Sequence, residues 1–440
     1  DENVSLKGWC ISDDAADIQK HQLYDLTIGP KAYLVLYADG TGDSGNLLNF
    51  KINPAGEKIF LSDNQRNIVD SIYIPEQKLG GVYARTTDGA KDWAIKEESI
   101  GYSNNDAGIV KFASLEAPIF SHESGFYKEE FTLTIKSELN CLIYYTLDGS
   151  EPTSDSLVYQ DGISIKNFNQ EKDTAVVVRA FAQNHKGVFS EIVTKTYFVG
   201  LPQYQKKNVA SIVADPEDIF GDEGIFVEGK DYLEGKSDIQ NFLQSGRAWE
   251  VKGNFEFFEN GLIVSNQEIG IRTQGASTRY ATKKKMSIYS REEYSGNKYF
   301  DGLTLGGNPI HSMYTNHSIS NIVFPELLKD RAVSIQHPIS CDVFLNGEYW
   351  YSTYLLEKYN KYYMEDTYQV NSDNVLIIKD DGVTDGPEGG YFYYSIVRGL
   401  ANMSDMSVFE EYENFKTAVD IQSYIDYICA NVYLCNMDVA

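Results

Sequence analysis

Positively charged residues are scarce in this sequence. Across 440 residues, 38 Lys and Arg stand against 64 Asp and Glu, which leaves a formal net charge of −26 at pH 7. A surface of that sign repels nucleic acid and anionic membranes, so we expect neither as a partner. It attracts basic peptides and divalent cations, although solubility alone would also explain the acidity.

Cysteine and histidine are also few, and long apolar runs are absent. The five Cys are widely spaced and include no Cys-x-x-Cys pair, which argues against a disulfide framework or a structural zinc site. The six His include no His-Glu-x-x-His motif, so a metallohydrolase has no support. Because no apolar run approaches 18 residues, we predict no membrane-spanning helix in this chain.

Aromatic residues, in contrast, are plentiful. The 32 Tyr and 22 Phe favour β-rich structure, and the length predicts two to four domains. Residues 1–108 have short apolar runs between Gly, Asp and Asn turns, as in a β-sandwich. These runs are Tyr33–Tyr37, Ile59–Leu61 and Ile68–Tyr73. The blocks Leu6–Asp14, Ile28–Tyr33 and Gly81–Arg85 resemble the lamin-tail domain, an immunoglobulin-like module of many bacterial surface proteins.

Residues 117–200 have the pattern of a second β unit. A strand runs into the turn pair Asp148-Gly149, and Pro152 then stops the strand pairing. The segment Leu142–Thr153 resembles the signature of chitobiase/β-hexosaminidase C-terminal-like domains, which are accessory sandwiches. That resemblance implies a surface module, with cell-wall or glycan contact as one expectation, although no aromatic platform for a glycan is recognisable.

Strands and helices mix after residue 201. The segments Pro338–Leu345 and Tyr349–Leu356 are predicted strands joined by Asn346-Gly347, a strong hairpin signal. A helix is predicted around Pro325–Arg331, and a further strand over Asn371–Lys379.

The most informative stretch runs from Ile269 to Arg291. Two alternating runs flank a polar turn, which predicts a β-hairpin. The small residues 275–278 let backbone N–H groups approach a ligand closely, and small residues with fixed cations suit phosphate oxygens. A solvated hairpin with basic flanks would have the same pattern, and no Walker A spacing is present. The flanking cations are Arg272, Arg279, Lys283, Lys284 and Lys285.

This stretch resembles the Arg-x-x-Gly-x-Ser…Lys signature of the spore-coat protein H (CotH) kinase family, atypical secreted or spore-associated protein kinases. The matching residues are Arg272, Gly275, Ser277 and Lys284. Further blocks in the family's order extend the resemblance over residues 201–440. They are Ser211–Asp218, Gly224–Gly229, Trp249-Glu250, Leu303–Asn308, Val343–Trp350, Glu357-Lys358 and Asn374–Lys379.

The resemblance implies a multidomain chain, with two immunoglobulin-like sandwiches before an α+β protein-kinase-like domain. It implies a bacterial cell-surface or extracellular enzyme that uses ATP and Mg²⁺ to phosphorylate Ser or Thr of proteins. The acidic charge would favour Lys/Arg-rich substrates. Two other functions remain open. One is a non-catalytic scaffold, or pseudokinase, whose sandwiches bind glycan or protein, and the other is a structural envelope protein.

Phosphoryl transfer needs a cation on the nucleotide phosphates and carboxylates near the metal and the attacking hydroxyl. By resemblance Lys284 is the phosphate cation, with its two Lys neighbours as alternatives because the register of a triple Lys is ambiguous. Arg272 and the amides of Gly275–Ser277 are candidates for further phosphate contacts. By analogy with kinases, Glu326 could orient Lys284, and Glu357 lies where a hinge beside the nucleotide is expected.

The last predicted helix leads to a candidate catalytic carboxylate. Asp420 can cap this helix, and an apolar stripe is expected to be its buried side. The stripe comprises Ile421, Tyr424, Ile425, Ile428, Val432 and Leu434. The helix leads into Asn436-Met-Asp438, and the resemblance implies that Asp438 is catalytic and binds metal. Helix capping and solvation would also explain an Asp at this position.

Three departures from the family weaken the expected activity. The predicted helix near Asn316–Asn321 lacks the acidic residue that the family often has at its start. Tyr351 stands where the family usually has Gly after the Tyr-Trp of the hairpin. The family's second metal-binding Asp lies beyond its Asn-x-Asp, whereas this chain ends at Ala440. We therefore expect a kinase-like domain that is truncated at its C-terminus. These 440 residues should bind ATP weakly or not at all and transfer no phosphate.

Overall fold

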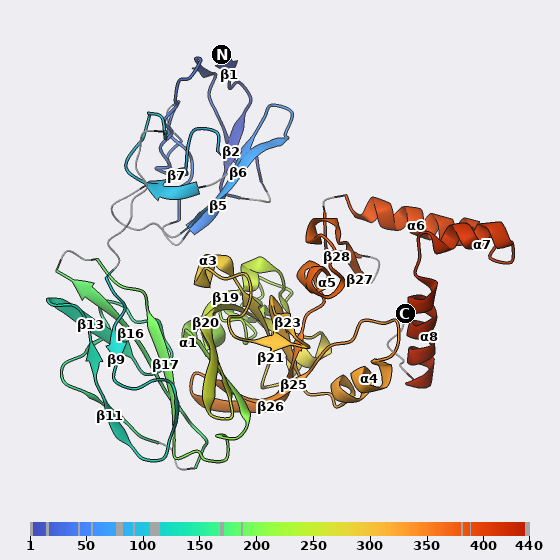
Figure 1. Cartoon of the computed structure of the whole chain (residues 1–440). Coiled ribbons are helices and arrows are strands. Elements are labelled where there is room, and N and C mark those ends of the chain that lie inside the picture. Colours follow the sequence, from blue (N-terminus) through green and yellow to red (C-terminus); the bar gives the residue numbers. More distant parts are fainter. Residues whose placement is uncertain are drawn as a thin grey trace. The chain divides into compact units, whose positions relative to one another are not determined.

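The apolar runs of the sequence pack into separate cores within two units, Asp1–Ser114 and Leu115–Ala440 (Figure 1). The structure is a computed structural model. It describes residues 3–14, 17–42, 45–53, 56–75, 82–90, 93–105, 115–167, 171–185, 188–379, 382–387 and 389–435.

The first unit contains a four-stranded antiparallel sheet in the order β3-β2-β5-β6. Its strands are β2 (Cys10–Ser12), β3 (His21–Gln22), β5 (Gly56–Ser62) and β6 (Ile68–Pro75). Two smaller pairs join β1 (Val4–Ser5) to β4 (Thr27–Ile28) and β7 (Val82–Arg85) to β8 (Trp93–Lys96). A core around Leu6, Leu23, Leu48 and Phe50 holds the unit together.

The expected strand Tyr33–Tyr37 is wrong in one respect. Its alternation does place Leu34 and Leu36 against the core, while Tyr33 and Tyr37 are about half exposed. The backbone pairs only through a bridge between Tyr37 and Leu47, so no strand forms. Side-chain alternation alone does not provide a partner strand for the backbone.

The second unit begins with a β-rich module. Its five-stranded sheet has the order β10-β17-β16-β13-β14, and two pairs, β9–β12 and β11–β15, accompany the sheet. Buried residues from both groups of strands, including Leu133, Ile165, Val178 and Tyr197, form one core. This arrangement confirms the predicted β-sandwich character. The strands are β9 (Ile119–Phe120), β10 (Gly125–Tyr127), β11 (Phe131–Leu133), β12 (Ile135–Lys136), β13 (Cys141–Thr146), β14 (Leu157–Val158), β15 (Ile163–Ile165), β16 (Val176–Asn184) and β17 (Val193–Val199).

Seven strands then close into a barrel in the order β18-β19-β20-β21-β24-β26-β25. They are β18 (Asn208–Ala214), β19 (Val251–Glu259), β20 (Leu262–Gln274), β21 (Lys285–Ser290), β24 (Ser312–Asn316), β25 (Ile339–Leu345) and β26 (Glu348–Glu357). The predicted hairpin at Asn346-Gly347 is confirmed, with φ of 48° and 82° at the two turn residues. Apolar side chains such as Phe255, Ile271 and Met286 fill the core, so a ligand would meet the barrel from outside.

Short elements lie between the barrel strands along the chain, and further helices follow Glu357 (Figure 1). The short elements are α1 (Pro216–Phe220), α2 (Lys230–Leu233), η1 (Asn241–Leu243), η2 (Arg247–Trp249), η3 (Ser277–Tyr280), α3 (Glu292–Ser295), β22 (Thr304–Leu305), β23 (Asn308–Pro309) and α4 (Ser320–Leu328). After the barrel come α5 (Lys361–Tyr368), η4 (Ser372–Asn374), β27 (Ile377–Lys379), β28 (Gly382–Asp385), α6 (Tyr391–Met403), α7 (Phe409–Lys416) and α8 (Ile421–Tyr433). The strand predicted over Asn371–Lys379 starts only at Ile377, because Asn371 caps η4 instead.

Helix α8 begins as predicted but buries a different side. The Asp420 carboxylate accepts a hydrogen bond from the Ser423 N–H at 3.0 Å, which caps the helix. The expected buried stripe is exposed at Tyr424, Ile425 and Val432. The buried residue of α8 is Asp426, whose carboxylate accepts a 2.9 Å hydrogen bond from the Ala332 N–H. The prediction of a buried apolar side is therefore wrong.

The sandwich module and the barrel share a third core. Phe198 and Leu201 pack there with Val209, Phe258 and Phe344, which lie on barrel strands. The backbone also crosses the junction, because the Ala175 N–H donates to the Gly347 carbonyl at 2.7 Å and Thr174 bridges to Glu348. The sandwich and the barrel are therefore packed as one unit and are not separated by a free linker.

Candidate phosphate-binding site

The predicted phosphate-binding hairpin is formed by β20 and β21. Arg272 lies opposite Ser287, and Gln274 lies opposite Lys285. Residues directly opposite each other in antiparallel strands project to the same face, so these four side chains share one face of the barrel wall. Lys284 precedes β21 by one position and therefore projects to the other face. The structure thus separates Arg272 from Lys284, which the sequence grouped as one phosphate site.

The turn between the two strands requires glycine at its start. Gly275 has a φ of +107°, and a Cβ at this position would collide with the Thr278 hydroxyl. Ser277 is exposed and begins the short helix η3, which the Arg279 N–H closes by donating to the Ala276 carbonyl at 3.0 Å. Gly275 and Ser277 therefore lie together in an open turn, where backbone groups can reach a ligand.

The three lysines after the turn have different surroundings. Lys284 is buried, its Nζ donates to the Arg279 carbonyl at 2.6 Å, and it lies 3.8 Å from the centre of the Phe242 ring. Burial lowers the pKa of Lys284. Lys283 donates to the Tyr349 carbonyl at 3.2 Å, and Lys285 donates to Asn316 Oδ1 at 2.9 Å. The strand register places Lys285 on the face of Arg272, and burial lowers the pKa of Lys285 as well.

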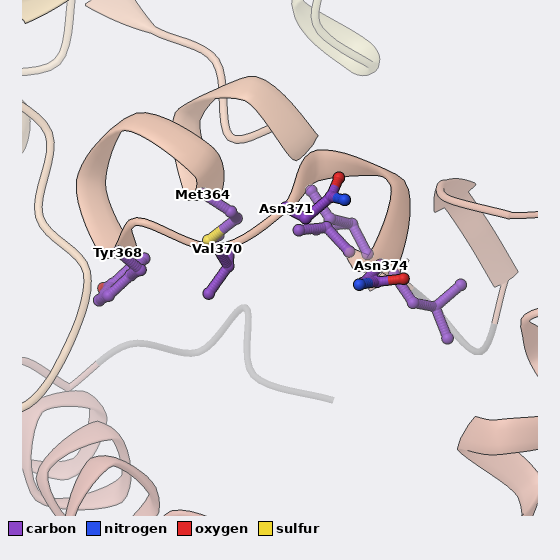
Figure 2. Close-up of a pocket in the computed structure, with 8 residues that line it drawn as sticks. Met364, Tyr368, Val370, Asn371 and Asn374 are labelled. Carbon is purple, nitrogen blue, oxygen red and sulfur yellow. The ribbon is translucent and has the colours of Figure 1, made fainter.

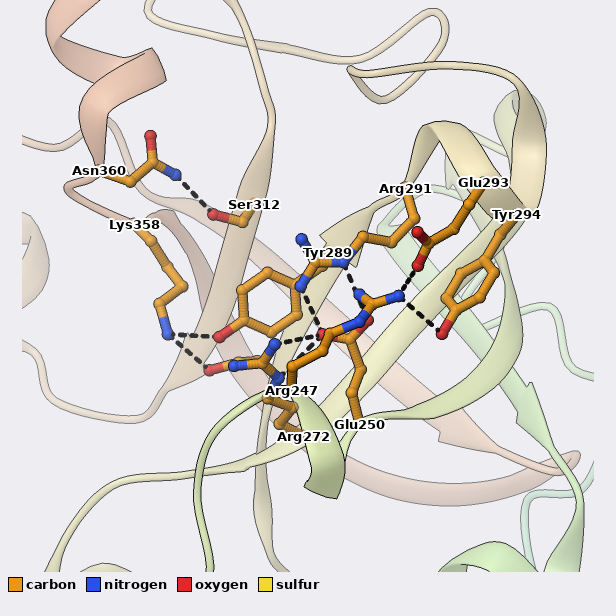
Figure 3. Close-up of polar contacts among 11 residues, drawn as sticks. Arg247, Glu250, Arg272, Tyr289, Arg291, Glu293, Tyr294, Ser312, Lys358 and Asn360 are labelled. Atoms are coloured by element: carbon orange, nitrogen blue, oxygen red, sulfur yellow. Dashed lines mark hydrogen bonds and ion pairs between the residues drawn. The ribbon is translucent and has the colours of Figure 1, made fainter. Parts of the chain in front are cut away.

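Arg272 belongs to a charged cluster around a buried carboxylate (Figure 3). The Glu250 side chain is fully buried and accepts from Arg272 Nε at 2.8 Å and from Arg291 Nε at 2.9 Å. Arg247 also pairs with this carboxylate and with Glu293. Glycine at position 270 makes room for the cluster, because a Cβ there would collide with Glu250.

The cluster continues to the end of β26. Lys358 Nζ donates to the Tyr289 hydroxyl at 3.0 Å and to the Ser287 hydroxyl at 3.1 Å (Figure 3). Beside it, Glu357 is buried, and burial raises the pKa of its carboxyl to about 8, with Asp366 adding to the shift. Neutral carboxyl groups at neutral pH are common at functional sites, although buried structural groups share this property.

Two predicted residues are separate from this cluster. Glu326 is exposed on α4, and its carboxylate accepts from Lys329 at 2.5 Å, whereas Lys284 bonds to the Arg279 carbonyl. Asp438 lies outside the described residues. Within the described part of the chain, no group of three or more His, Cys, Asp and Glu could hold a metal ion. The described residues therefore offer cations for phosphate, whereas the predicted metal-binding residue is not among them.

Sequence reasoning gave no role to Glu250, Tyr289, Arg291 or Lys358. A signal for part of this set was present, because positions 285, 287, 289 and 291 alternate along one strand and its extension. Glu250 and Lys358 could not be found in this way. They are far from β21 in the sequence and reach it through strand pairing, Glu250 from just before β19 and Lys358 from just after β26.

Two pockets lie elsewhere in the second unit. One of about 410 Å³ lies at the junction of the sandwich and the barrel, where Lys283 and Trp350 line it. The other, of about 590 Å³, lies beside α5 and has no charged residue in its lining (Figure 2). Its lining comprises Met364, Tyr368, Val370, Asn371, Asn374, Val375, Leu376 and Ile377. This second pocket suits an apolar ligand better than a phosphate.

Comparison with known proteins identifies one module. Residues 132–197 match the model of the Fn3-associated family, and this match spans β11 to β17 of the sandwich. No curated protein matches the chain. In the described part of the chain, no helix is long and apolar enough to cross a membrane. The family match is compatible with a β-sandwich module, and the lamin-tail, chitobiase-like and kinase-like assignments stay predictions.

Proposed function

We propose that this chain is part of a surface-associated protein kinase, which transfers the γ-phosphate of ATP to Ser or Thr of protein substrates. The observation that carries the proposal is the β20–β21 hairpin. It gathers cations of a strongly acidic chain on both sides of an open, small-residue turn. Such a turn suits phosphate oxygens, because backbone amides and fixed cations stabilise their charge.

The order of elements is compatible with this proposal. A β barrel comes first, and helices α5 to α8 follow from Glu357 onward, as expected for a nucleotide held between a β-rich and a helical part. The strand end at Glu357 and Lys358 would then lie beside the nucleotide. The order of elements supports the proposal by analogy with kinase-like folds, and the function itself depends on the residues of the site.

The chemistry that we assign to the residues follows from phosphoryl transfer, which is mostly positioning and charge neutralisation. Arg272 and Lys285 share a face on which they can neutralise phosphate oxygens, and Gly275 and Ser277 supply the open turn. Lys284 would need to leave the Arg279 carbonyl to reach a phosphate. By resemblance, Asp438 accepts the proton of the attacking hydroxyl and is the residue that would hold Mg²⁺, which would supply further charge neutralisation.

One observation favours a second function, a non-catalytic scaffold. The Lys284 ammonium is buried between a carbonyl and an aromatic ring, which is a stable structural role for a lysine. The Fn3-associated module, fused to the barrel through a common core, would then present a rigid surface to a glycan or protein.

A transfer assay distinguishes the two functions. The full-length protein would be incubated with labelled ATP, Mg²⁺ or Mn²⁺, and a basic Ser-rich peptide. We expect transfer that is abolished by Lys284→Met and by Asp438→Asn, and unchanged by Lys416→Ala, which alters an exposed lysine on α7. Thermal unfolding of each variant would exclude simple loss of the fold.

Each outcome has a defined meaning for the proposal. Transfer that survives both substitutions would overturn the residue assignments while leaving the enzyme class. Absence of both transfer and ATP binding in the full-length protein would overturn the kinase proposal in favour of the scaffold.

A further inference from the structure

Three cations surround one aromatic ring on the outer face of the barrel. The Arg272 and Arg291 guanidinium carbons each lie 4.6 Å from the centre of the Tyr289 ring, and Lys358 Nζ lies 5.2 Å from it (Figure 3). Each contact is favourable by itself, because the ring face carries negative charge. Together they hold three like charges close to one another, which is costly unless an anion balances them.

The carboxylates nearby do not balance these charges. Arg247, Arg272 and Arg291 all pair with Glu250, and Arg247 pairs in addition with Glu293. The partners of Lys358 in the described structure are the hydroxyls of Ser287 and Tyr289, which are neutral. Four cations against two carboxylates leave an excess of two positive charges, in a chain whose net charge is −26.

The cluster is both fixed and accessible. Glu250 is fully buried and holds the two guanidinium groups on either side of it, which restricts their orientation. The Arg272 and Arg291 side chains are each about 20% exposed, so both are partly accessible to solvent. A binding group that is oriented in advance loses little entropy when a ligand arrives.

We propose that Arg272, Arg291 and Lys358 bind a chain of phosphate groups on the outer face of the barrel. Guanidinium groups match phosphate oxygens with paired N–H donors, and Lys358 adds a point charge beside them. Two guanidinium groups already lie over the Tyr289 ring, so we assign this ring to the cations and not to a nucleobase. The site therefore recognises the phosphate chain and not the base. A nucleoside triphosphate and an inorganic polyphosphate both carry this chemistry.

This inference rests on the proposed function only for the choice of a nucleotide as the natural source of the phosphates. It assigns phosphate binding to residues other than Lys284, on the opposite face of the hairpin. Its failure and the failure of the kinase proposal are therefore separable. Binding of tripolyphosphate requires neither transfer nor Asp438.

The test is a calorimetric titration of the full-length protein with tripolyphosphate, ATP and inorganic phosphate at low salt. We expect tripolyphosphate and ATP to bind with similar affinity, and inorganic phosphate to bind more weakly. Lys358→Met should weaken tripolyphosphate binding at least about tenfold, because a charge-assisted contact is lost. Among the described residues, Lys358 Nζ bonds to the Ser287 and Tyr289 hydroxyls, so this substitution spares the ion pairs of Glu250. The matched control Lys416→Met removes the same charge from α7.

A second, more conservative variant distinguishes loss of the binding contact from loss of the fold. Tyr289→Phe keeps the ring and removes the hydroxyl that accepts from Lys358, and it should change affinity less than Lys358→Met does. Tripolyphosphate binding that is equal in the wild type and in Lys358→Met would overturn the site, as would absence of binding to a folded wild type. ATP binding without tripolyphosphate binding would show a base-directed site elsewhere and would also overturn it.

Discussion

The ring of Phe198 should couple the folding of the sandwich module to that of the barrel. Phe198 is fully buried, and its ring centre lies 4.5 Å from Phe126, 5.4 Å from Phe258 and 5.0 Å from Phe344. The last two residues belong to barrel strands β19 and β25. Truncation to alanine removes buried apolar contacts and leaves a cavity, which costs about 3–5 kcal/mol in such positions.

That loss can be located by hydrogen exchange. In Phe198→Ala, the backbone amides of β17 in the sandwich and of β25 in the barrel should both exchange about a hundredfold faster or more. A loss of about 3 kcal/mol gives this factor, because each 1.4 kcal/mol corresponds to a factor of about ten. The control Leu139→Ala alters a side chain that is 94% exposed and should change stability by less than about 0.5 kcal/mol. Loss of protection confined to β17, with β25 unchanged, would refute the shared core as a coupling element.

Two further predictions concern buried carboxyl groups. Glu250→Gln should lower the free energy of unfolding by about 2–3 kcal/mol in chemical denaturation. This loss is smaller than the loss on breaking a fully buried ion pair, because the arginines are partly exposed. An unchanged denaturation midpoint would contradict the prediction. Burial raises the pKa of Glu256 from its usual 4.5 to about 7, so the folded state retains a proton that the unfolded state releases. The stabilisation that comes from protonated Glu256 is therefore fully present below about pH 4.5 and is lost as pH rises through about 7. Glu256→Gln should flatten this decline in unfolding free energy with pH, and an unaltered slope would assign the decline to other groups.

Local sequence signals determined several elements of this protein. Asn346-Gly347 specified the β25–β26 hairpin, because both turn positions need a positive φ that these residues tolerate. Asp420 specified the start of α8, because its side chain caps the first turn. The alternating runs on either side of Gly275 specified the β20–β21 hairpin. Each of these signals lies within a few residues of the structure that it determines.

Only the tertiary structure decided which side chains meet. Three adjacent lysines are equivalent in the sequence, and the register of β20 against β21 places Lys285, not Lys284, on the face of Arg272. Glu250 and Lys358 are more than a hundred positions apart, and the pairing of β19, β20, β21, β24 and β26 brings both to that face. The apolar stripe of α8 predicted burial, but burial depends on what packs against a helix, and periodicity carries no information about that neighbour. The sequence therefore determined the local turns, caps and strands, whereas long-range packing decided the composition of the charged cluster and the fusion of the sandwich to the barrel.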